Sequence, residues 1–234
     1  EAQAPGKRRM KVFATVNLCQ VWRSREALPP SHFALAHPDW ITVHYNPNRP
    51  PDETPEFWLD PGVPAVQEFA ANLCGEIVDK YPVDGLLVES LGYRPGGFGY
   101  APAALRRFAL ETRRSDRPAP TDPEWLQWRA RQVTALAGRA AFSARLRKSN
   151  LIIALEGLAE GPLTGAFTDT DPYRESGQDW PAWLREGLAD ALVLKTFKRQ
   201  SNAAQAEEFQ QWLTYAAVRS SGRALIAGLA ARDN

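Results

Sequence analysis

Five short, almost unbroken apolar runs constrain the fold of this chain more than any other feature. They lie at residues 11–17 (KVFATVN), 84–89 (DGLLVE), 151–156 (LIIALE), 191–196 (ALVLKT) and 224–229 (ALIAGL). Continuous apolar runs are typical of strands covered on both faces, as in parallel sheets. Helical patterns fill the intervals, at residues 64–81, 123–148, 179–186 and 202–219. This alternation predicts βα units and a parallel sheet.

The connections between these elements differ in length on the two sides of the predicted sheet. Long segments follow the first three strands, at residues 18–63, 90–101 and 157–178, whereas the returns at 81–84 and 149–150 are short. Parallel α/β folds build their functional sites in loops at the C-terminal ends of strands. We therefore expect the site among the three long segments.

Composition and motifs exclude several classes of function. The chain has 28 Lys and Arg against 27 Asp and Glu, so it lacks the basic balance of a nucleic-acid partner. No apolar run is long enough to span a membrane. No nucleotide-binding Gly motif follows a strand, so no cofactor is expected. No nucleophile elbow is present either, so hydrolysis by a nucleophile of that kind has no support. Two cysteines cannot form a zinc site alone, and His32, His37 and His44 lack metal-ligand spacing, so no metal is expected.

Two carboxylates end neighbouring predicted strands. Glu89 ends the second run and Glu156 ends the third. Side chains at these positions could approach each other across the mouth of the sheet. Glycoside hydrolysis needs such a pair, in which one carboxyl protonates the leaving oxygen and the other attacks the sugar or activates water. The alternative is that either Glu only pairs with a neighbouring Arg or caps a loop.

Other polar and aromatic side chains surround the same edge. Lys195 interrupts an apolar strand, so it pairs with one of the two glutamates, binds substrate, or extends along the rim. Asn17 ends the first run and either donates to a sugar hydroxyl or caps the loop. Trp22, His44 and Tyr93 lie in the long segments, where they either contact a sugar or form small loop cores.

An ordered set of motifs resembles the glycosyl-hydrolase-like family 10 proteins from about residue 10 to 234. The motifs include KVFATVNLCQVW, HPDW, YPVDGLLVESLGYRP, DPEWLQWRARQVTAL, QDWPAWLREGLADALV and GLAARDN. The resemblance implies a (β/α)8 TIM barrel that is incomplete in this chain. About five of eight strands are expected, corresponding to the family's strands three to seven, in a single partial domain over residues 1–234. It also implies export to the periplasm, the cell envelope or the exterior.

The sequence departs from the family pattern at two strands. Glu89 stands where the family has its catalytic Asp after the fourth strand, and Gly92 stands where the family has an Arg. After the family's sixth strand, Lys198 matches but Phe197 replaces a Tyr. The resemblance therefore implies sugar contacts for Lys198, as it does for Asn17 and Trp22, and places the catalytic carboxylate at Glu89.

Three hypotheses remain open from the sequence. The first is a glycoside hydrolase that acts on a cell-envelope or extracellular polysaccharide through Glu89 and Glu156. The second is a catalytically degenerate barrel that binds a polysaccharide or oligosaccharide through its loop aromatics. The third is a structural or interaction domain without a role in glycan chemistry. The oligomeric state is not predicted.

Overall fold

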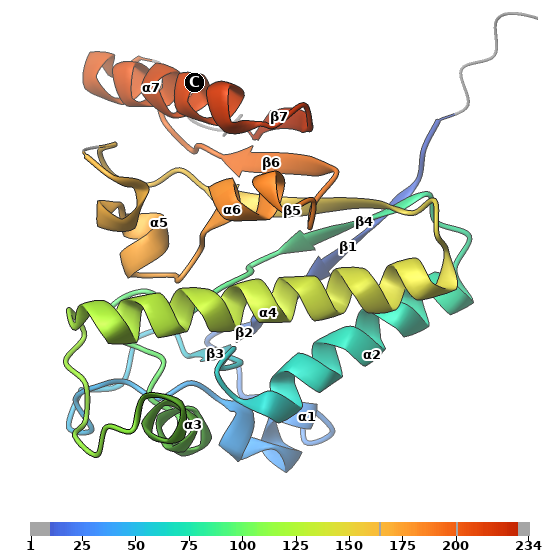
Figure 1. Ribbon diagram of the computed structural model, residues 1–234. Coiled ribbons are helices and arrows are strands. Elements are labelled where there is room, and N and C mark those ends of the chain that lie inside the picture. Colours follow the sequence, from blue (N-terminus) through green and yellow to red (C-terminus); the bar gives the residue numbers. More distant parts are fainter. Residues whose placement is uncertain (1–9, 164, 200, 229–234) are drawn as a thin grey trace, which may run out of the picture.

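One parallel sheet organises the molecule. The computed structural model describes residues 10–163, 165–199 and 201–228. Its five main strands are all parallel, in the order β1-β4-β5-β6-β7 (Figure 1). The strands are β1 (Phe13–Asn17), β4 (Gly85–Glu89), β5 (Ile152–Leu158), β6 (Ala191–Lys195) and β7 (Ala224–Gly228). The sheet confirms the five predicted strands, except that residues 229–234 of the terminal family motif lie outside the described residues.

Helices connect the strands and cover one face of the sheet. In Figure 1, α2 and α4 lie against each other in front of β1 and β4, and α7 lies beside β7. The helices are α1 (Phe33–Ala36), α2 (Pro64–Lys80), α3 (Pro102–Thr112), α4 (Pro123–Arg147), α5 (Asp171–Arg174), α6 (Trp180–Arg185) and α7 (Ala203–Arg219). Short 3-10 turns occur at Pro38–Trp40 and Phe167–Asp169. Parallel strands with crossover helices fit an incomplete (β/α) barrel.

The two faces of the sheet differ in their environment. The face under the helices is apolar, with Leu86 and Val88 of β4 among its buried side chains. The opposite face carries Glu89, Glu156 and Lys195 at its C-terminal end. We predicted strands covered on both faces, and this is wrong for the edge strands. Alternate residues of β1 are exposed, and on β7 Ala224, Ile226 and Ala227 are exposed, Ile226 by 52%.

The tryptophans on the helices form part of the packed interior. Trp125, Trp128, Trp183 and Trp212 are all fully buried. Trp125 and Trp128 stack with their ring centroids 5.0 Å apart. The Nε1 group of Trp128 donates to Glu111 at 2.7 Å, so the buried indole keeps a polar partner. These contacts fix α4 against α3 and the sheet.

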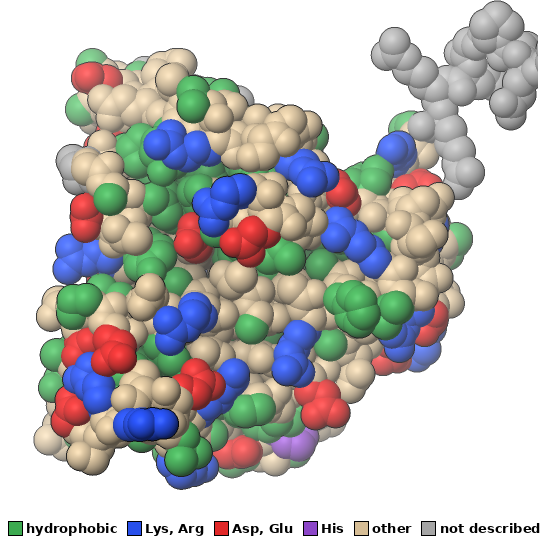
Figure 2. Space-filling view, viewed as in Figure 1, with side chains coloured by type: hydrophobic (Ala, Val, Ile, Leu, Met, Phe, Trp, Pro, Cys, Tyr) green, Lys and Arg blue, Asp and Glu red, His purple; other side chains and the backbone are tan. Residues whose placement is uncertain are grey.

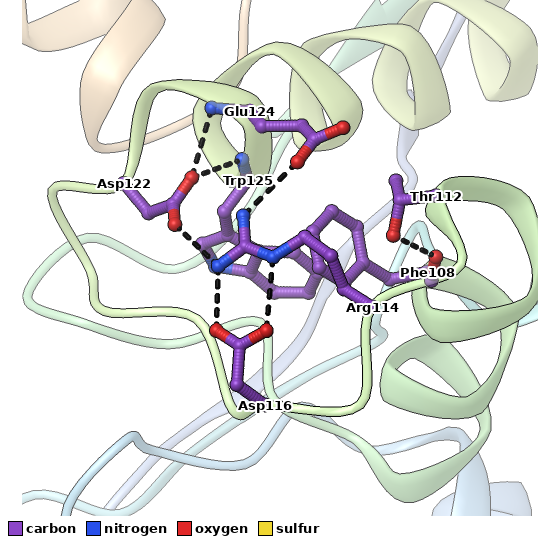
Figure 3. Close-up of polar contacts among 7 residues, drawn as sticks. All are labelled: Phe108, Thr112, Arg114, Asp116, Asp122, Glu124 and Trp125. Atoms are coloured by element: carbon purple, nitrogen blue, oxygen red, sulfur yellow. Dashed lines mark hydrogen bonds and ion pairs between the residues drawn. The ribbon is translucent and has the colours of Figure 1, made fainter.

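An arginine ties α3 to the start of α4 (Figure 3). The Arg114 guanidinium binds the carboxylates of Asp116, Asp122 and Glu124. Asp122 is also the N-cap of α4, since it accepts from the backbone N–H groups of Glu124 and Trp125. Exposed ion pairs of this kind contribute at most about 1 kcal/mol each. The sequence predicted the helix over 123–148, which is α4, but not α3.

Charges are mixed on the molecular surface. Figure 2 shows basic and acidic side chains interspersed over one face, without one sign gathering there. In the part of the chain that the structure describes, no helix has the length and apolarity needed to cross a membrane.

Candidate active site

The long segments enclose a cavity of about 240 Å³ at the C-terminal ends of β4, β5 and β6. One wall is a hairpin of two short antiparallel strands, β2 (Gln20–Arg23) and β3 (Glu56–Trp58), which lies between β1 and α2 in sequence. The loop after β4, the end of β5 with its following loop, and the end of β6 form the rest. The cavity lies among the long segments that follow the strands, which is where the sequence predicted a functional site. Its charged and aromatic lining residues are Arg23, Glu56, Trp58, Tyr93, Glu156, Glu160 and Lys195.

The two predicted carboxylates lie side by side. Val88 of β4 pairs with Leu155 of β5, so Glu89 and Glu156 follow as neighbours on the same face of the sheet. Glu156 is only 2% exposed, whereas Glu89 is half-buried. Burial raises the pKa of Glu156, and the charge of Glu89 acts in the same direction. One carboxyl is therefore biased toward its protonated form beside a more accessible one.

Lys195 binds the buried member of this pair. Its Nζ lies 3.2 Å from Glu156 Oε2, which confirms one of the two pairings expected from the sequence. The contact follows from register, because Glu156 is opposite Val193 and Lys195 lies two residues further along the same face of β6. The ammonium group lowers the pKa of Glu156, but less than burial raises it.

Ser90 links the ends of three strands. It follows Glu89 directly and has a left-handed backbone with φ of 51°. Its Oγ donates to Asn17 Oδ1 at 3.2 Å, its backbone N–H donates to the Glu156 carboxylate, and its carbonyl accepts from Cys19 at 3.2 Å. A non-Gly residue in this conformation costs roughly 1–2 kcal/mol. These bonds hold Ser90 there and place Asn17 beside the carboxylates, as predicted.

Two predicted contact residues lie outside the cavity lining. Trp22 packs edge-on to the ring of His32, with centroids 5.7 Å apart. His44 contacts Phe98 edge-on at 5.0 Å. Trp22 therefore packs within the 18–63 segment and His44 packs against the 90–101 segment, in line with the loop-core alternative left open for both residues.

The side chains of two further predicted residues are engaged by other groups of the protein. Lys198 Nζ binds Glu208 of α7 at 2.5 Å, because the chain has left β6 and turned toward that helix. Tyr93 belongs to the cavity floor, but its ring is fully buried beneath the guanidinium of Arg129, 4.4 Å from the ring centroid. Sugar contacts of Lys198 and Tyr93 stay predictions.

Sequence reasoning missed several groups that shape the cavity. Gln178 is the clearest case, because its buried amide donates to the carbonyl of Leu91 and accepts from the N–H of Leu158, both at 2.8 Å. It thus joins the loop after β4 to the end of β5. No periodicity or motif marks a single Gln in a long loop. Glu56 and Glu160 were missed for the same reason.

Gly92 departs from the family pattern for a steric reason visible in the loop. Its φ is 155°, and a Cβ at this position would lie 2.6 Å from the carbonyl oxygen of Ser176. No larger side chain fits without moving the 174–178 segment. The arginine of the family pattern therefore has no equivalent at this position.

A buried aspartate lies behind the cavity floor. Asp60 is fully buried and accepts from the N–H groups of Gly62 and Ala101 and from the hydroxyl of Thr42. Burial raises its pKa to about 6, although these donors and the charge of Arg129 oppose that shift. The Asp60 carboxylate thereby connects Gly62, just before α2, and Ala101, just before α3, with Thr42 of the 18–63 segment.

Asp60 should make stability depend on pH in a defined window. Between about pH 4 and 6 the folded state keeps a proton that the unfolded state has lost, so the free energy of unfolding should fall as pH rises. A shift of two pKa units corresponds to roughly 3 kcal/mol. Urea unfolding at several pH values should show this fall in the wild type. The difference between the wild type and Asp60→Asn should vary by this amount between pH 4 and 6, and a constant difference would contradict the assignment.

In chemical terms, the cavity offers the buried carboxyl group of Glu156 and the ammonium group of Lys195, and Glu89 lies next to Glu156 on β4 without lining the cavity itself. Among the described residues, no three His, Cys, Asp or Glu side chains are grouped so that they could hold a metal ion. The arrangement can therefore donate a proton at one oxygen and hold a negative charge a few ångströms away. Both functions are required for glycosidic bond cleavage.

Comparison with known proteins agrees with this geometry. The family described as Glycosyl hydrolase-like 10 matches residues 4–233. The curated protein Glycosyl hydrolase DigH of Escherichia coli (strain K12) is 24% identical over 226 residues, covering 88% of this chain and 47% of that protein. DigH of Shigella flexneri matches equally. The chain thus spans about half the length of these relatives.

Solved structures resemble the fold. The PgaB (BpsB) glycoside hydrolase domain from Bordetella bronchiseptica gives a TM-score of 0.69 at 18% identity, covering 95% of this chain and 62% of that chain. A cold-adapted beta-galactosidase from Rahnella sp. R3 gives 0.53 at 12% identity, covering 83% and 30%. These matches confirm the family resemblance and the incomplete barrel that it implied.

Proposed function

The chain belongs to the glycosyl hydrolase-like 10 family, and on that premise we propose that it is part of a glycoside hydrolase whose reacting groups are Glu89 and Glu156. The observation that carries this proposal is the position of the two glutamates side by side on neighbouring strands, with Glu156 lining the cavity and its pKa raised by burial. A glycosidase needs one protonated and one ionised carboxyl group at the same moment.

The environments of the two groups assign their roles. Glu156, with its raised pKa, donates a proton to the leaving glycosidic oxygen. Glu89 attacks the anomeric carbon, and the resulting glycosyl ester is hydrolysed by a water that the ionised Glu156 deprotonates. After proton donation Glu156 carries a negative charge, which Lys195 stabilises from 3.2 Å.

The register of the strands favours retention of configuration. Neighbouring strands lie about 4.8 Å apart. That spacing suits the carboxyl separation of retaining enzymes, about 5–5.5 Å, better than the separation of about 6.5–9.5 Å in inverting enzymes. Glu89 would then act as the nucleophile, at the position that the family gives to its catalytic Asp.

The proposed substrate is a polysaccharide of the cell envelope or the exterior, and the proposed location is outside the cytoplasm. Both follow from the family resemblance. The second candidate, a glycan-binding barrel without catalysis, is favoured by one specific observation. At Gly92 the family's Arg is absent, and the loop packing leaves no room for it.

The test is an assay of reducing ends released from bacterial cell-wall glycans and exopolysaccharides. It uses the full-length protein, with the double variant Glu89→Gln/Glu156→Gln as the inactive control. Release by the wild type and not by the variant supports the hydrolase. Glycan binding by both proteins without release supports the binding barrel, and neither release nor binding contradicts both.

A further inference from the structure

The hairpin β2–β3 holds an indole ring in a fixed position at the cavity. Trp58 Nε1 donates to Glu56 Oε2 at 2.9 Å. Glu56 is itself held, because its Oε1 lies 3.2 Å from Nε of Arg23 and its Oε2 accepts from Gln20 Nε2 at 3.4 Å. Two hairpin neighbours therefore hold the carboxylate that orients the ring.

Most of the polar side chains in the cavity already have partners within the protein, and this leaves the indole as its distinctive surface. Glu56 pairs with Arg23, and Glu156 pairs with Lys195. Trp58 is only partly buried, and it lines the same cavity as Glu156 and Lys195. A ligand that fits such a wall has an apolar face for the ring and a polar edge for the surrounding groups. A sugar ring has both, because its C–H groups form an apolar face and its hydroxyls form the edge.

We propose that the β2–β3 hairpin is a sugar-binding subsite beside the carboxylate pair, with Trp58 as its stacking surface. The guanidinium of Arg23 is held through Nε, which leaves its terminal nitrogens for ligand hydroxyls at the rim. This inference rests on the proposed function and extends it. The reacting sugar lies at Glu89 and Glu156, and an adjoining sugar lies on Trp58, so the substrate is an oligosaccharide or polysaccharide and not a simple glycoside.

The structure supplies a matched control in the same hairpin. Trp22 is also on β2 but packs against His32 and is absent from the cavity lining. Its Nε1 is buried without a hydrogen-bond partner, so Trp22→Phe removes no such bond. The variants Trp58→Ala, Trp58→Phe and Trp22→Phe thus separate stacking in the cavity from packing of the hairpin.

The experiment measures binding in the full-length protein carrying Glu89→Gln, so that cleavage does not deplete the ligand. The probes are oligosaccharides of one to six units, prepared by partial hydrolysis of the glycans used in the activity assay. Trp58→Ala should weaken binding of two or more units about tenfold, as expected for loss of an aromatic anchor. Trp58→Phe should recover most of this loss, and Trp22→Phe should bind normally. Single sugar units should bind all variants alike.

The outcomes distinguish this proposal from the hydrolase assignment. If the wild type cleaves glycans and Trp58→Ala binds every length as tightly as its parent, the subsite is wrong and the hydrolase stands. If nothing is cleaved but Trp58→Ala still loses affinity for longer oligosaccharides, the subsite stands and the hydrolase fails. Equal loss in Trp22→Phe would assign the effect to the hairpin fold, which would overturn the proposal. Absence of binding to any probe would overturn it as well.

Discussion

Replacing Glu156 by Gln is expected to lower kcat on natural glycans about 10²- to 10⁴-fold, because the variant cannot donate a proton to the leaving oxygen. The loss should depend on the leaving group. An aryl glycoside whose leaving group is stable as an anion needs no proton, so its bond should still be cleaved. Steady-state kinetics on a natural glycan and on an activated aryl glycoside would measure this difference.

The pH dependence should change in a direction set by the raised pKa of Glu156. The protonated form is required for bond cleavage, so wild-type activity should fall as pH rises through that pKa. Glu156→Gln should lose this alkaline limb and retain the acidic limb. A variant whose profile matched that of the wild type would show that another group supplies the proton.

Glu89→Gln is the matched control, because it changes the neighbouring carboxylate on the adjacent strand. The amide cannot attack the anomeric carbon, so this variant should lose activity on natural and activated substrates alike, and by more than Glu156→Gln. If Glu89→Gln instead retained activity on the activated substrate while Glu156→Gln lost it, the two roles would be reversed.

The strands of the sheet and the positions of Glu156 and Lys195 could be predicted from the sequence, because the local pattern of apolar residues determines them. Glu156 and Lys195 lie within apolar strands, where alternation fixes which face a side chain occupies. Parallel strands then bring their C-terminal ends to one edge. Lys198 lies just beyond β6, where that rule no longer applies, and its side chain turns to α7.

The hairpin wall could not be predicted for a physical reason that concerns Trp22 and Trp58. The two strands of the hairpin are only four and three residues long, too short for a periodic signal. The pairing register shifts between Gln20 and Trp22, so a bulge interrupts the alternation of faces. Which tryptophan lines the cavity therefore depends on tertiary structure, and the sequence pattern could not single out Trp58.

Replacing Arg129 by Met is expected to lower the free energy of unfolding by about 3–5 kcal/mol, the cost of breaking a buried charge interaction from one side. Arg129 is 4% exposed on α4. Its terminal nitrogens donate to the carbonyls of Arg174 and Glu175 at 3.0 and 2.6 Å, and its charge opposes the raised pKa of Asp60. Methionine fills a similar volume but leaves two carbonyls without donors and the aspartate without a cation. Urea unfolding at pH 7, where Asp60 is ionised, measures the loss.

The same substitution should also reduce activity, since Arg129 holds the segment that forms one side of the cavity. Ser176, next to the two bonded carbonyls, accepts from the N–H of Tyr93 at 2.9 Å and lines the cavity.

A double-mutant cycle that combines Arg129→Met with Asp60→Asn separates the effect on stability from the effect on activity. The unfolding costs should be less than additive, because each variant removes the partner that makes the other change costly. The loss of activity should instead follow Arg129→Met alone, because the hydrogen bonds of Asp60 go to Thr42, Gly62 and Ala101, away from the 174–176 segment. If the unfolding costs were additive, the charges of Arg129 and Asp60 would act independently. If the kinetics of Arg129→Met were unchanged, the cavity would keep its shape without the hydrogen bonds from Arg129 to the 174–176 segment.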